Sequence, residues 1–113
     1  MKTDPSPILT PDLATQIKEI GAALARLRIA RGVKQDQAAS RAGLSRNTAY
    51  RLEKGDPGIA LGHILRYLDA IVPGKTLYQL LSQSDPALAA LSAQEQRRRA
   101  RDLSKSELKE LDF

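Results

Sequence analysis

Cysteine and tryptophan are absent from the sequence, and phenylalanine and histidine occur once each. The lack of cysteine excludes disulfide scaffolds, thiolate metal sites and cysteine nucleophiles. His63 has no second histidine with which to hold a metal, so we assign it a structural role. No apolar run approaches the roughly 20 residues of a membrane-spanning helix. Residues 1–12 also lack the charged-then-apolar order of a signal peptide. We therefore expect a soluble, cytoplasmic protein.

Patterns typical of catalysis are also scarce. Gly55, Gly58 and Gly62 follow no strand and precede no Lys-Ser or Lys-Thr pair, so they do not form a phosphate-binding loop. Glu107 and Glu110 are a carboxylate pair at helical spacing, but they fall in a charged stretch that favours simple solvation. The sequence does not predict an enzyme, and it predicts no cofactor.

The chain has 113 residues, 42% of them hydrophobic and 27% charged, which is typical of one globular domain with a tail. Its net charge of +5 lies entirely between Ile17 and Val72, where ten Lys or Arg stand against five Asp or Glu. Eight charges of each sign cancel outside that segment. This distribution favours an anionic partner, most commonly nucleic acid, although a solvated surface that serves only solubility would carry the same charge.

The spacing of apolar residues predicts an all-α protein without strands. Thr10 and Pro11 suit the N-cap and first position of a helix, and Gly32, Gly43 and Gly55 suit helix ends. Five expected helices cover residues 11–31, 34–42, 46–54, 61–71 and 77–81.

Helical signals continue after the fifth helix. Asp85-Pro86 can start a helical turn, and Ser92 with Glu95 and Ser104 with Glu107 have the spacing of capping boxes. We expect a loose arm over residues 1–9, a five-helix domain over residues 10–82 and a helix-prone extension over residues 83–113.

The most informative stretch is Val33–Gly55. Two short helices joined by a Gly-Leu-Ser turn cannot pack side by side over any length, so they cross steeply and the second is presented on the surface. Four side chains share its outer face, at spacings i, i+1, i+4 and i+5: Arg46, Asn47, Tyr50 and Arg51.

This outer face has the chemistry to read base edges. Arg46 or Arg51 can form bidentate hydrogen bonds to O6 and N7 of guanine, and Asn47 can do the same to N6 and N7 of adenine. The alternative is a solvated helix face, and Tyr50 can equally pack on its own domain. Gln35, near the start of the preceding helix, is placed to hold a phosphate or to brace the second helix.

Residues 17–71 resemble the helix-turn-helix domain of the lambda-repressor and Cro type, also called the XRE family. The resemblance rests on Lys34-Gln35, on the turn from Ala39 to Ser45, on the closure from Tyr50 to Gly55 and on the Leu-rich helix that follows. It implies a lambda-repressor-like domain of five helices that binds operator DNA as a homodimer.

The resemblance also implies roles for single residues. Arg46, Asn47, Tyr50 and Arg51 match base-facing positions, and Glu53 matches a structural acid that does not contact DNA. The expected phosphate-contacting or bracing residues are Gln35, Lys34, Ser45, Thr48 and Lys54. The chain departs from the family at Gln37-Ala38, where Glu-Leu is frequent, and the smaller Ala38 is expected to loosen the packing there.

A narrower resemblance concerns Glu53–Gly62, which together with the basic extension is similar to HipB-like antitoxins. Such proteins bind DNA and also bind HipA-like kinase toxins, so a toxin protein is a candidate partner. Nothing in the physical features of the chain demands one.

Several apolar residues near the fifth helix exceed what a small core needs, and spare apolar side chains often find a second subunit. They are Leu77, Tyr78, Leu80, Leu81, Leu88 and Leu91. We expect a dimer interface that includes Leu77, Tyr78 and Leu81, which would place two recognition helices about one DNA turn apart. The basic run Arg97–Arg101 can serve a second contact with nucleic acid, a solvated helix face or a toxin-binding surface.

These patterns predict a sequence-specific, nucleoid-associated transcriptional regulator, most simply a repressor that occupies a palindromic operator. The antitoxin of a toxin-antitoxin operon is the more specific form of this hypothesis. The competing hypothesis is a protein-interaction module that has the same fold but does not read DNA.

Overall fold

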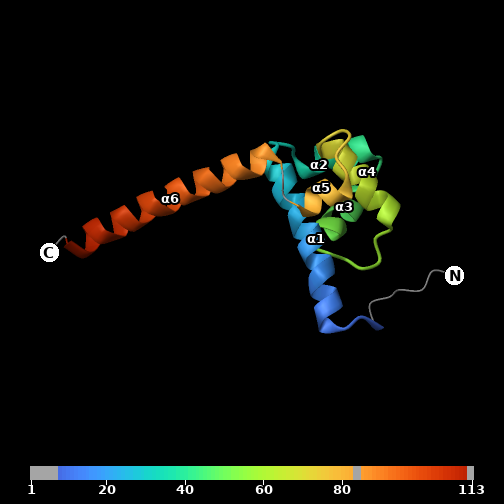
Figure 1. Ribbon diagram of the computed structural model, residues 1–113, viewed down its shortest axis with the longest axis horizontal. Helices are drawn as coiled ribbons and strands as arrows, with labels where there is room; N and C mark the ends of the chain where they lie inside the picture. Colours follow the sequence, from blue (N-terminus) through green and yellow to red (C-terminus); the bar gives the residue numbers. More distant parts are fainter. Residues whose placement is uncertain (1–7, 83–84, 112–113) are drawn as a thin grey trace.

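The computed structural model describes residues 8–82 and 85–111, with side chains as far as Leu103. Six helices and no strands are present in these ranges. They are α1 (Pro11–Ala30), α2 (Gln35–Ala42), α3 (Arg46–Glu53), α4 (Leu61–Ile71), α5 (Leu77–Leu81) and α6 (Pro86–Leu111). The first five helices gather into one bundle, and α6 extends from it into solvent (Figure 1). The predicted all-α fold, with five helices and a helical extension, is confirmed.

The starts of the helices follow the capping signals in the sequence. Thr10 Oγ1 accepts from the N–H of Leu13 at 3.2 Å, with Pro11 in the first helical turn. Ser45 Oγ accepts from the N–H of Thr48 at 3.0 Å. Thr76 and Gln79 form the expected capping box at the start of α5. These side chains satisfy donors that the first turn of a helix leaves free.

Gly43 allows the chain to turn sharply between α2 and α3. Its φ of 70° lies in the left-handed region, where a side chain is costly. The N–H groups of Gly43 and Leu44 bond back to Ser40 and Ala39, which closes the end of α2. A turn of only three residues therefore joins the two helices, at the Gly-Leu-Ser sequence that predicted it.

The core lies where α1, α2, α3 and α4 meet. Its largest fully buried side chains are Leu24, Leu27, Tyr67 and Leu68. Ala38, Ala39 and Ala42 are buried on α2, and Ala49 and Leu52 on α3, so small residues line the crossing of these two helices. Burial of this one face leaves the opposite face of α3 in solvent.

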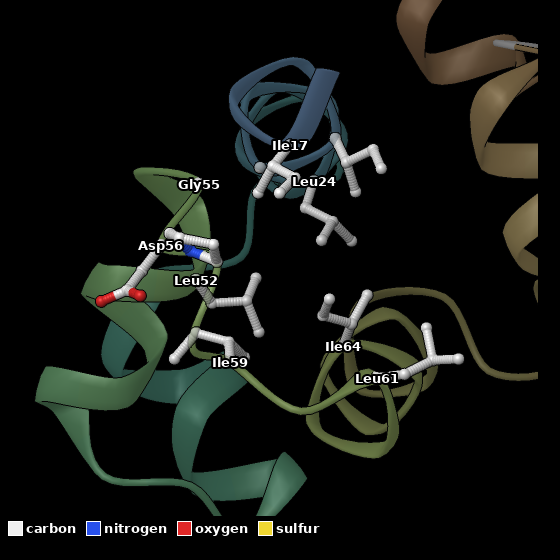
Figure 2. Close-up of a pocket in the computed structure, with 11 residues that line it drawn as sticks. Ile17, Leu24, Leu52, Gly55, Asp56, Ile59, Leu61 and Ile64 are labelled. Carbon is white, nitrogen blue, oxygen red and sulfur yellow. The ribbon is translucent and has the colours of Figure 1, made fainter. Parts of the chain in front are cut away.

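An apolar cavity of about 180 Å³ lies between α1, the α3–α4 loop and α4 (Figure 2). Ile17, Leu52, Ile59 and Ile64 are among its lining residues, and Ala38 is not. Ala38 itself has no exposed surface. Ala38, where the sequence predicted looser packing, therefore does not give rise to this cavity, which lies beside α1 and α4.

The expected arm over residues 1–9 lies mostly outside the described residues, as do the side chains of Ser104, Glu107 and Glu110. No helix in the described ranges is both long and apolar enough to cross a membrane.

The two C-terminal capping boxes are not helix starts, because α6 is continuous from Pro86 to Leu111. Ser92 and Glu95 lie inside it and serve another purpose. Arg26 of α1 donates from Nη2 to Glu95 Oε1 at 2.7 Å and to Ser92 Oγ at 3.1 Å. The side-chain pair that resembled a cap attaches α6 to α1.

The start of α6 is held by a buried carboxylate. Asp85 is 3% exposed, and its Oδ2 accepts from Arg31 at 2.6 Å and from Lys75 at 3.0 Å. Its Oδ1 accepts from the N–H of Ala87 at 2.9 Å, which caps the helix. Burial by itself would raise the pKa of Asp85, but these donors outweigh it and lower that pKa to about 2.

The apolar residues near α5 are only partly spare. Leu80 belongs to the core, and Leu77 and Leu88 pack against it. Tyr78 is 82% exposed and Leu81 is 54% exposed. The expectation that the whole set exceeds the needs of the core was wrong, because α5 and the start of α6 cover the bundle.

Candidate nucleic-acid interface

The outer face of α3 carries the four side chains that the sequence singled out. Arg46, Asn47, Tyr50 and Arg51 are all exposed, while Ala49 and Leu52 on the same helix are buried. No hydrogen bond or ion pair within the described ranges occupies the side chain of Arg46 or Asn47. Both stand in the first turn of α3 with their donors open to a ligand.

The other two side chains of this face are engaged within the protein. Arg51 Nε donates to Asp56 Oδ2 at 2.7 Å, and hydrogen bonds from Arg51 and then from the N–H of Gly58 lower the pKa of Asp56. The ammonium of Lys54 lies 5.5 Å from the centre of the Tyr50 ring, which is within cation–π range. This bond uses one of the five N–H donors of Arg51 and leaves those on its two Nη atoms for another acceptor.

Ser45 and Thr48 share one hydrogen-bonding unit at the start of α3. Ser45 Oγ accepts from the N–H of Thr48 and donates to Thr48 Oγ1 at 2.8 Å. The hydroxyl of Ser45 is therefore used in capping, whereas Thr48 keeps its own O–H proton for another acceptor. Lys34 and Lys54 are exposed and flank α2 and α3.

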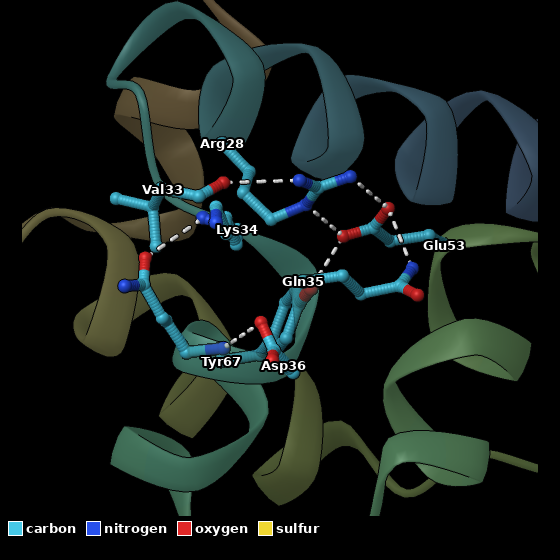
Figure 3. Close-up of polar contacts among 8 residues, drawn as sticks. Arg28, Val33, Lys34, Gln35, Asp36, Glu53 and Tyr67 are labelled. Atoms are coloured by element: carbon cyan, nitrogen blue, oxygen red, sulfur yellow. Dashed lines mark hydrogen bonds and ion pairs between the residues drawn. The ribbon is translucent and has the colours of Figure 1, made fainter.

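A polar cluster inside the domain holds α3 in place (Figure 3). Its centre is Glu53, whose side chain is 7% exposed. Arg28 donates from Nε to Glu53 Oε2 at 2.7 Å and from Nη2 to Oε1 at 3.0 Å. Gln35 Nε2 donates to Oε1 at 3.0 Å, and the hydroxyl of Tyr67 donates to Oε2. One carboxylate thus joins α1, α2, α3 and α4.

The cluster extends to the loop before α2. Arg28 Nη1 donates to the carbonyl of Val33 at 3.0 Å. Hydrogen bonding to Glu53 raises the pKa of Arg28, and burial followed by the bond to Glu53 raises that of Tyr67. Arg28 therefore stays ionised, and Tyr67 stays a neutral donor, over the whole physiological range of pH.

The geometry distinguishes between the two roles suggested for Gln35. Its amide donates to Glu53, which is the bracing arrangement, and the carbonyl oxygen of the same amide is left as an acceptor. Sequence reasoning placed Glu53 as a structural acid but missed Arg28 and Tyr67, which lie 25 and 14 residues from it. Only the fold brings these residues together.

Close backbone contact with α1 fixes α3 from behind. A methyl group at Gly21 would lie 2.6 Å from the carbonyl oxygen of Leu52 and 2.7 Å from that of Glu53. One at Gly55 would collide with the backbone of Lys18, and Gly55 has a φ of 78°. Glycine at both positions lets the end of α3 rest directly on α1.

Residues 19–71 match the family model described as a helix-turn-helix domain. This part of the chain is therefore similar to helix-turn-helix domains. The match covers α2, the Gly43 turn, α3 and α4 together with most of α1. No curated protein and no solved structure matches the chain significantly. A helix-turn-helix domain points to a DNA-binding regulator, and α3 occupies the position of its second, surface-presented helix.

Proposed function

We propose that this protein is a sequence-specific DNA-binding regulator of the XRE type that reads its operator with α3. The observation that carries the proposal is the contrast between the two sides of this helix. Its inner side is fixed by Glu53 and by contact with α1, while Arg46 and Asn47 on its outer side have open donors. A rigid helix with free Arg and Asn side chains is suited to the major groove.

Phosphate contacts would surround this reading face. Lys34 and Lys54 supply exposed donors near the ends of α2 and α3, and the half-buried Thr48 supplies a hydroxyl in the first turn of α3. Gln35 serves mainly to brace α3, and Ser45 serves mainly to cap it. Repression needs no further machinery, because occupancy of a promoter is enough to block transcription.

A homodimer is part of the proposal, since it presents two copies of α3 about one DNA turn, roughly 34 Å, apart. Tyr78 and Leu81 are large, apolar and exposed on α5, whereas Leu77 is mostly committed to the core. We expect Leu81→Glu to produce a monomer in sedimentation equilibrium. Leu103→Glu, at an exposed leucine on α6, is the matched control and should leave the dimer intact. A dimer that persists in Leu81→Glu would remove α5 from the interface.

The antitoxin form of the proposal adds a toxin protein of the HipA-like kinase class as a partner. Support for it comes from the resemblance of Glu53–Gly62 to HipB-like antitoxins; in the structure this segment forms the end of α3 and the loop to α4. The test is co-elution of the purified protein with the product of the adjacent gene. Separate elution of the two proteins would leave a regulator without a toxin.

The competing proposal is a protein-interaction module that does not read DNA. The ion pair between Arg51 and Asp56 favours it, because one of the four reading side chains is already engaged. Salt distinguishes the two proposals, since phosphate contacts weaken steeply with ionic strength and an apolar protein interface does not.

A gel-shift titration against the DNA upstream of its own gene tests the main proposal. Scrambled duplex is the competitor, and the titration is run at two salt concentrations. We expect retardation that specific duplex competes away, that scrambled duplex does not, and that weakens with salt. Absence of retardation at micromolar protein would support the interaction module instead.

A further inference from the structure

The outer half of α6 separates its charges onto two sides. Ser92 and Glu95 face α1, and Arg99 and Asp102 continue the same line at the spacings i+7 and i+10 from Ser92. A second line holds Gln94, Arg97, Arg98 and Arg101, at i, i+3, i+4 and i+7. We call Arg97, Arg98 and Arg101 the basic stripe. It contains no acid, and all three residues are exposed.

No hydrogen bond or ion pair among the described residues holds the side chains of the stripe, although Arg98 helps to lower the pKa of Glu95. Glu95, the nearest acid on the inner line, is already bonded to Arg26. Like charges three or four residues apart destabilise a helix, and Arg97 with Arg101 and Arg98 with Arg101 are such pairs. A helix with only a structural role would be better served by alternating charges along this side. The like charges of the stripe repel one another in the free protein, and an anionic surface would relieve that repulsion.

The base of α6 lies at the edge of the proposed DNA interface. Asp85 is bonded to Arg31, which precedes Lys34 by three residues at the corner where α1 passes to α2. Two further bonds from Arg26 hold the next turns of α6 against α1. From this corner α6 projects away from the bundle as one long helix (Figure 1). At 1.5 Å per residue, Arg97 lies about 18 Å from Asp85 along the helix, which is about five base pairs of duplex.

We propose that the basic stripe of α6 is a second, sequence-independent contact with DNA, directed at the phosphates of duplex that flanks the site read by α3. The guanidinium group suits phosphate because it is always charged and presents paired donors. Such contacts add affinity and salt dependence without adding sequence preference. This inference deepens the proposed function and rests on it only for the position of the stripe beside the site that α3 reads.

The test measures binding of an unselected, random-sequence duplex to the full chain by fluorescence anisotropy, over a series of salt concentrations. Arg97→Gln/Arg98→Gln/Arg101→Gln removes the stripe. Three phosphate contacts should lower the slope of log affinity against log salt by about 2.7. From about 50 to 200 mM salt, the affinity of the parent should therefore fall about 40-fold more than that of the triple variant.

Two controls distinguish the effect of the stripe on DNA binding from the effects of total charge and of folding. Arg99→Gln changes the same residue type on the inner line of the same helix, and it should alter the slope by much less than one third of the triple effect. Arg97→Lys/Arg98→Lys/Arg101→Lys keeps the charge and should keep the parent slope. Glutamine is a good helix former, and equal circular dichroism at 222 nm verifies that α6 is retained.

The outcomes distinguish this inference from the proposed function. An unchanged slope in the triple Gln variant overturns the proposal that the stripe contacts DNA. A change of slope in Arg99→Gln as large as one third of the triple effect overturns it as well. If the parent shows no sequence preference but its slope still falls by about 2.7 on removal of the stripe, the stripe stands and the reading role of α3 fails. A parent that binds no duplex overturns both.

Discussion

Replacement of Glu53 by glutamine should destabilise the domain strongly, because it leaves the guanidinium of Arg28 without a counter-charge. Glu53 and Arg28 are 7% and 14% exposed, so water cannot replace the lost partner fully. Glutamine also presents an NH₂ group to a site where Arg28, Gln35 and Tyr67 all donate. Removal of one partner from a buried pair costs about 3–5 kcal/mol. We expect about 3 kcal/mol for Glu53→Gln, since its remaining carbonyl oxygen can still accept two of the four hydrogen bonds.

Urea unfolding followed by circular dichroism measures this change. A loss of about 3 kcal/mol lowers the melting temperature by roughly 12–24 °C in a domain of this size. Glu95→Gln is the matched control, because its partner Arg26 is 42% exposed and Glu95 is 44% exposed. Exposed pairs contribute little, so the control should change the free energy of unfolding far less.

A double-mutant cycle isolates the pair itself. Arg28→Met in the Glu53→Gln background should cost much less than Arg28→Met in the parent, because the buried charge no longer has a partner to lose. Equal and small losses of unfolding free energy for Glu53→Gln and Glu95→Gln would refute the reasoning. Equal costs of Arg28→Met in the two backgrounds would refute it as well.

The remaining predictions concern the base of α6 and the seat of α3. The pKa of Asp85 is lowered from 3.8 to about 2, so this residue stabilises the fold above about pH 4, and the contribution disappears as the pH falls through 2. Asp85→Asn should therefore cost about 2 kcal/mol at pH 7, by urea unfolding, and nearly nothing at pH 2; a difference independent of pH would contradict this. Gly55→Ala should cost several times more than Gly32→Ala, because only the former combines a positive φ with a clash against Lys18, whereas no atom lies within 4 Å of the added methyl at Gly32. Equal melting temperatures of the two glycine variants would show that α3 does not rest tightly on α1.

The sequence alone was sufficient for most of the helical architecture. Thr10, Ser45 and Thr76 start helices because each side chain caps the N–H group three residues later, which is a local interaction. Gly43 and Gly55 have positive φ angles at the ends of α2 and α3 for an equally local reason. Local signals therefore predicted the first five helices to within one or two residues.

Long-range contacts explain what the sequence did not reveal. Ser92 and Glu95 have the spacing of a helix start, but Arg26 binds both of them, 66 and 69 residues away along the chain. The engagement of Arg51 by Asp56 depends on how the α3–α4 loop folds back. The spare apolar surface near α5 was overestimated because Leu77, Leu80 and Leu88 are used by the bundle itself. Spacing rules describe one helix and cannot include such partners.

Base reading by α3 is the central claim, and Arg46→Ala tests it most directly. The measurement is a gel-shift titration of parent and variant against a selected duplex and its scrambled counterpart at one salt concentration. Loss of a bidentate contact should weaken binding to the selected duplex by about 1–3 kcal/mol, which is roughly 5- to 150-fold, with a loss of preference at one base pair. Binding to the scrambled duplex should change little. Equal behaviour of variant and parent on both duplexes would contradict the account.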